Sequence, residues 1–204
     1  MDTVSFFLVQ HGDLHSATVA GSPTYADRIF AGLTDDQMRA RPGPGLNSLV
    51  WLLWHMARTE DVSVNLVVAD GSQVFDDDWA RRLNAPWRII GTGMPEGEVA
   101  ELTAHADIAA LRAYRDAVGR RTQGIVRTLK PAAWEEIIGV ADTARAAQAG
   151  AFRSNTAWVE GTGYRSWQDQ SRAARLAGGA LRHNAIHLGE AITVRGLGGF
   201  PLGV

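Results

Sequence analysis

The chain has 204 residues and a formal net charge of −2, from 20 Lys and Arg against 22 Asp and Glu. That length suits one domain, residues 1–204, with a sizeable core, and dispersed, balanced charge argues against a nucleic-acid partner. The absence of cysteine excludes disulfides, thiolate metal sites and a cysteine nucleophile. Any metal must therefore be held by His, Asp, Glu or water.

The apolar start at residues 6–9 is too short for a signal-peptide core and has no basic leader before it. No later run approaches the ~20 apolar residues of a membrane span. We therefore expect a soluble, cytoplasmic protein whose partner is a small-molecule substrate rather than a membrane.

The first half of the chain has helical hydrophobic spacing nearly throughout. A helical region over about residues 3–33 should break at Gly21-Ser22-Pro23, because proline supplies no amide donor to a continuing helix. The connector ARPGPGLNS follows, and Asn47 or Ser48 is a good N-cap for a second helix that stops at Gly71.

The second half predicts two more long helices. Residues 72–98 are rich in Gly, Pro and Trp and predict an irregular crossover. A third helix over about residues 97–129 is closed by Lys130-Pro131, and the mixed segment after it is best interpreted as helical. Residues 151–165 fit either a loop or a short strand pair, and a last helix spans about residues 166–195. Four long helices with long connections predict an all-α bundle with crossovers.

The last helix carries His183, His187 and Glu190 at spacings of four and three in ALRHNAIHLGEAITVRG. Relative to His183, His187 lies about 40° to one side of the helix and Glu190 about 20° to the other, on an otherwise apolar or small stripe. The small residues 178–180 would let a neighbouring helix approach closely. A metal site and a buried helix with hydrogen-bonded polar residues both fit this pattern. It is not the zincin pattern, because Asn184 stands where the general-base glutamate would be.

A third imidazole, His55, lies on the second helix in the middle of a core-facing stripe. Glu60 and Asp61 lie more than about 100° around the helix from it, so they are poor metal ligands there. We expect them to be solvated or outer-layer charges. The residues that share the stripe of His55 are Ser48, Trp51, Leu52, Thr59, Val62 and Leu66.

His11 and His15 in VQHGDLHS form a rival pair, also four residues apart on an apolar face. Gly12 between them weakens the helix, and the sequence offers no evident third ligand nearby. A surface or helix-end role is therefore the expectation for this pair.

The stretch GLTDDQMRARPGPGLNSLVWLLWHMARTEDVSVN resembles the DinB/YfiT-like superfamily, where a similar signature precedes and forms the second helix. IGTGMPEGEVAELTAHADIAALRAYRDAV is similar to the crossover and third helix of actinobacterial-type members. HNAIHLGEA is similar to the His-x3-His of the family's last helix. The resemblance extends over about residues 30–196.

This resemblance implies a DinB-like four-helix bundle in down-up-up-down order with long crossovers and a divalent metal held by three residues. His55 matches the second-helix ligand, and His183 and His187 match the last-helix pair. Zinc or nickel is the usual ion, and iron or cobalt also suits imidazole ligands. Glu190 is then placed to orient an imidazole, accept a proton or join the ligands. Arg58, near the edge of the His55 face, is a candidate for binding an anionic substrate, against the simpler role of a partly exposed arginine whose stem packs on the core.

Characterised members of that superfamily include thiol-dependent S-transferases and a maleylpyruvate isomerase that use mycothiol or bacillithiol. The resemblance thus implies S-transferase or hydrolase chemistry with such a thiol as cofactor. The predicted last helix ends within ten residues of Val204, so we expect no further C-terminal domain of the isomerase type and hence no isomerase activity. A non-catalytic small-ligand-binding or stress-response module is the alternative. A homodimer through the crossover tryptophans Trp79 and Trp87 is a third expectation.

Overall fold

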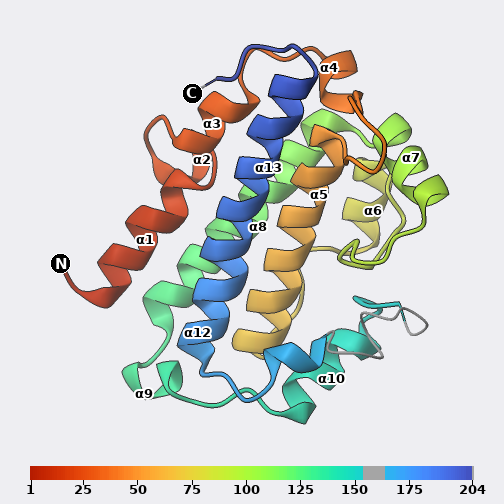
Figure 1. Cartoon of the computed structure of the whole chain (residues 1–204). Helices are drawn as coiled ribbons and strands as arrows, with labels where there is room; N and C mark the ends of the chain where they lie inside the picture. Colours follow the sequence, from red (N-terminus) through yellow and green to blue (C-terminus); the bar gives the residue numbers. More distant parts are fainter. Residues whose placement is uncertain (154–163, 204) are drawn as a thin grey trace.

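The computed structural model describes residues 1–153 and 164–203, and the four rods of a helical bundle lie within them (Figure 1). Rods α5 and α8 run in one direction, and α1 and the rod ending in α13 run in the other, which confirms an all-α bundle in down-up-up-down order. The rods are α1 (Thr3–Asp13), α5 (Leu49–Glu60) with η1 (Asp61–Val68), α8 (Ile108–Thr128), and α12 (Arg172–Leu176) with η3 (Ala177–Arg182) and α13 (His183–Leu197).

Shorter helices connect the rods, and among the described residues the only β pairing is an isolated bridge between Ile137 and Ser171. No described helix has both the length and the apolar character needed to cross a bilayer. The connecting helices are α2 (Ala17–Ala20), α3 (Tyr25–Phe30), α4 (Asp35–Arg39), α6 (Asp77–Leu83), α7 (Glu96–His105), α9 (Pro131–Trp134), α10 (Val140–Gln148) and η2 (Tyr164–Trp167).

The start of the second helix is as expected: Ser48 is the N-cap of α5, and its hydroxyl accepts a hydrogen bond from the amide of Trp51 at 3.1 Å. The end of that rod differs, because Asp61–Val68 is wound as a π helix. A second π helix, η3, directly precedes His183, so both rods that carry the site histidines contain a widened segment.

Several expected boundaries are wrong, because side-chain caps start new helices inside segments that the sequence pattern predicts as single elements. The expected third helix is two helices, α7 and α8, since the carboxylate of Asp107 accepts from the amide of Ala110 and begins α8 afresh. The crossover contains α6, capped in the same way by Asp76. The first helical region also breaks just after α1, and the last rod begins at Arg172. The strand pair considered for residues 151–165 falls largely on residues 154–163, outside the described residues.

Helix α5 is the centre of the bundle, and every one of its residues from Leu49 to Glu60 is buried. It packs against α8 and α13 and is further covered by α4 and α7. Trp79 and Trp87 in the crossover are partly buried and pack on the same core. Because α5 is covered on every side, polar residues on any of its faces lie in the interior of the bundle, and these include His55.

Candidate metal centre

His55 is held in place by the crossover. Its Nδ1 lies 2.5 Å from the carbonyl oxygen of Ile90, and since a carbonyl only accepts, Nδ1 carries the proton and Nε2 keeps its lone pair. Its ring also stacks on Trp51, with 4.6 Å between ring centroids. Gly91 makes the approach feasible: at φ +100° a Cβ there would lie 2.6 Å from the ring of Trp54 and 3.2 Å from Nδ1 of His55.

His187 is oriented by Glu190 one turn further along α13. The Nδ1–H of His187 donates to Oε2 of Glu190 over 2.7 Å, which leaves the lone pair on Nε2. Bonding to His187 holds the pKa of the Glu190 carboxyl below its usual value. Asn47, just before α5, lies at 3.5 Å from the other carboxylate oxygen. An outer carboxylate that fixes the tautomer and direction of an imidazole is a common support for a metal-ligating histidine.

His183 completes a group of three histidines whose ring nitrogens lie within 4.8 Å of one another. Its Nε2 is 3.1 Å from Nε2 of His55, while its Nδ1 is buried with no hydrogen-bond partner in the part of the chain that the structure describes. Burial lowers the pKa of His55 to about 4 and of His183 to about 2, and the neighbouring imidazoles contribute in the same direction. Both rings are therefore neutral at pH 7, as metal coordination requires.

The donor set fits a divalent ion. Two imidazole nitrogens bound to one ion at about 2.0–2.1 Å each would lie about 3–3.4 Å apart, and the two Nε2 atoms here are 3.1 Å apart. The side chain of His187 is 18% exposed and that of Glu190 is 30% exposed, so the group is open to solvent on the α13 side. Three histidines with an open side resemble catalytic metal sites more than closed structural ones.

Arg58 lies elsewhere. Its side chain is fully buried, and its guanidinium donates to Asp61, to the hydroxyl of Tyr114 and to the carbonyl oxygen of Arg88. It also lies over the ring of Phe75 at 4.4 Å. The partly exposed position that we expected is thus wrong, and the residue links α5 to α8 and the crossover rather than facing an open pocket.

Glu60 and Asp61 are not solvated, contrary to expectation, because the covered α5 rod has no solvent-facing side. Asp61 accepts from the backbone amides of Val74 and Phe75 and so anchors the crossover. Neither carboxylate belongs to the three-histidine group, as the helical angles predicted. His11 and His15 lie at the end of α1, one of the two positions expected for them, but they are fully buried against Glu60 rather than at the surface.

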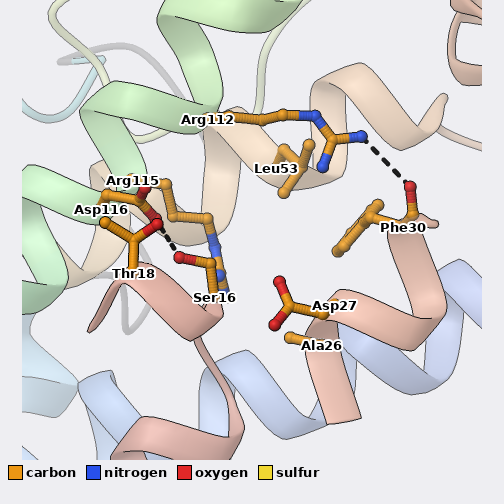
Figure 2. Close-up of a pocket in the computed structure, with 9 residues that line it drawn as sticks. All are labelled: Ser16, Thr18, Ala26, Asp27, Phe30, Leu53, Arg112, Arg115 and Asp116. Carbon is orange, nitrogen blue, oxygen red and sulfur yellow. Dashed lines mark hydrogen bonds between the residues drawn. The ribbon is translucent and has the colours of Figure 1, made fainter. Parts of the chain in front are cut away.

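Figure 2 shows a separate pocket of about 220 Å³ between α3 and α8 that none of the three histidines lines. Its polar groups are largely paired with each other or with the backbone: Ser16 donates to Asp116, and Arg112 donates to the carbonyl oxygen of Phe30. Asp27 accepts from the amide of Ala17. Because its polar groups are largely engaged in hydrogen bonds, the pocket is a weaker candidate for a functional site than the histidine group.

Sequence reasoning placed the three histidines on inward faces but missed their supports, Ile90 and Gly91. A Gly-Thr-Gly in the crossover was the only available signal, because a carbonyl group carries no side-chain pattern.

A family model described as the DinB superfamily matches residues 21–191. The chain belongs to the DinB superfamily. No curated protein matches it. Among solved structures, the crystal structure of a conserved protein from Enterococcus faecalis is similar with a TM-score of 0.65, 17% sequence identity and 97% of both chains covered. At that identity the likeness concerns the fold alone.

Proposed function

We propose that this DinB-superfamily protein is a divalent-metal-dependent enzyme whose ion is held by His55, His183 and His187. The observation that carries the proposal is the approach of Nε2 of His55 to Nε2 of His183, while Nδ1 of His55 and of His187 is engaged by Ile90 and Glu190. Zinc or nickel is the expected ion, with iron or cobalt as alternatives.

The chemistry that we propose is thiol-dependent S-transfer or hydrolysis. When bound, a divalent ion lowers the pKa of a water or thiol ligand toward neutrality and polarises a carbonyl. The chain has no cysteine, so a thiol nucleophile must come from a low-molecular-weight cosubstrate such as mycothiol. Ile90 and Glu190 hold the rings of His55 and His187 in one tautomer, and the proton-accepting role that we propose for Glu190 acts through its hydrogen bond with Nδ1 of His187.

Elemental analysis of untagged protein, purified without chelator, tests the metal. We expect His187→Ala to lose about one equivalent from the three-histidine site. His105→Ala, which removes a histidine outside that group, should lose none. Glu190→Gln should weaken binding at that site by about 10–100-fold, because it removes the charge that orients His187.

Turnover is tested next, by screening thiol-dependent transfer and hydrolysis with wild type and His187→Ala. An active metal-free variant would contradict the proposal. Wild type that refuses zinc and nickel but binds a small thiol without chemistry would favour a ligand-binding or stress-response module on the same bundle.

A further inference from the structure

A second group of ligating side chains lies fully buried between α1, α5, α8 and α13. Nε2 of His11 is 2.9 Å from Oε1 of Glu60, and Nε2 of His15 is 2.9 Å from Oε2 of the same carboxylate. The two imidazole centroids are 4.3 Å apart. His11 lies in the last turn of α1 and His15 just past its end, and Glu60 supplies from α5 the third ligand that the sequence did not reveal.

The carboxylate of Glu60 is oriented by two further donors. The hydroxyl of Thr122 on α8 donates to Oε1 over 2.7 Å, and the side-chain amide of Asn184 on α13 donates to Oε2 over 2.7 Å. A carboxylate has about four lone-pair sites, so these donors leave one site on each oxygen directed toward the histidines. Metal-ligating carboxylates are commonly hydrogen-bonded in this way from outside.

The helix opposite is shaped around His15. Gly119 lies in the middle of α8, and a Cβ there would be 2.6 Å from Nδ1 and 2.9 Å from Cε1 of that ring. A glycine inside a helix costs about 0.5–1 kcal/mol relative to alanine, and here it admits the imidazole. Among the described residues, Nδ1 of both histidines is buried without a hydrogen-bond partner, and each ring contacts the carboxylate of Glu60 through its Nε2.

We propose that His11, His15 and Glu60 form a second metal site, which takes a divalent transition-metal ion such as Zn²⁺ in a structural role. Ligands about 2.0–2.2 Å from an ion and about 90° apart are about 2.9 Å from each other, and both nitrogen–oxygen distances here are 2.9 Å. Two imidazoles and a bidentate carboxylate supply the four donor atoms of a closed site. All three side chains are fully buried, so there is no open position for a substrate.

Such an ion would tie α1 to α5, while Thr122 and Asn184 connect its carboxylate to α8 and α13. This site shares no ligand with the three-histidine group and does not depend on the proposed function. Asn184 directly follows His183, so the bonds that hold Glu60 also fix the start of α13.

The test counts metal in a variant whose three-histidine site has been removed. His55→Ala with His187→Ala leaves the buried group intact. Because that group is closed to solvent, protein should be unfolded with chelator, refolded with excess Zn²⁺, desalted and analysed for zinc. We expect about two equivalents of zinc in wild type and about one in the double variant. The equivalent that the double variant keeps should be released to a chelator much more slowly than the equivalent lost with the three-histidine site. Adding Glu60→Gln, which keeps shape and removes charge, should reduce the double variant to near zero.

A double variant that regains its native helical circular dichroism yet binds no zinc would overturn the inference. The inference would also be overturned if wild type held one equivalent of zinc that is released in a single phase and is lost in His187→Ala. This measurement does not require a folded variant of the buried site. Wild type that holds only one equivalent, all of which survives in the double variant, would support the buried site and contradict the proposed three-histidine centre. Failure of one proposal is therefore separable from failure of the other.

Discussion

Substitution of Gly119 by alanine should destabilise the protein, although the same change elsewhere in α8 should stabilise it. Gly124, in the same helix, has nothing within 4 Å of an added Cβ. Gly124→Ala should therefore gain about 0.5–1 kcal/mol from the reduced freedom of the unfolded chain and the better helix propensity.

At Gly119 this gain is outweighed by a collision. The added Cβ would lie 2.6, 2.9 and 3.1 Å from three ring atoms of His15. Overpacking of this kind costs about 1–3 kcal/mol. If the ring turns away, its hydrogen bond to the carboxylate of Glu60 is lost as well, at about 1.5–3 kcal/mol for a bond to a charged group. The net expectation for Gly119→Ala is a loss of about 2–5 kcal/mol.

Urea unfolding of metal-free protein at pH 7, followed by circular dichroism and tryptophan fluorescence, measures both variants against wild type. Equal m-values would show that the change is in stability rather than in the unfolded state. A Gly119→Ala variant as stable as Gly124→Ala would contradict this expectation, since the ring of His15 could not then lie against α8.

Three other predictions concern the supports of the site. Gly179→Ala places a Cβ 2.2 Å from the hydroxyl oxygen of Ser63 on the facing π helix, and it should lower the free energy of unfolding by about 1–3 kcal/mol, measured by thermal unfolding. Gly189→Ala on the same rod is the control: its Cβ meets none of the described atoms within 4 Å, so it should be neutral or stabilising. Tyr114→Phe removes a donor 2.7 Å from the buried carboxylate of Asp61 and should cost about 1.5–3 kcal/mol, and an unchanged urea midpoint would contradict that bond. Metal-free protein should lose stability as the pH falls from about 6.5 toward 4, because histidines that stay neutral in the folded protein bind protons in the unfolded chain. Urea midpoints that do not change between pH 7.5 and 4.5 would contradict this prediction. The histidines responsible have their pKa lowered by burial: His15 to about 3, His55 to about 4 and His183 to about 2.

Local patterns along the chain were enough to predict which segments are helical and which way most of the candidate ligands face. Spacings of three and four residues put His183, His187 and Glu190 on one side of a helix wherever that helix packs, and the same rule put His55 on an inward stripe. Glycines 178 and 179 indicated a close approach, and Gly179 does face Ser63 on η1. These features depend only on neighbours along the chain.

Tertiary structure alone decided the surroundings of those ligands. Ile90 is 35 residues from His55, and Glu60 is 49 and 45 residues from His11 and His15, so these contacts depend on how the rods pack and not on any local pattern. Periodicity identifies the more apolar face of a helix, but it cannot reveal that α5 is covered on every side. Because α5 is covered in this way, Glu60 lies at the centre of a buried polar group and not in the outer position that the helical angles indicated.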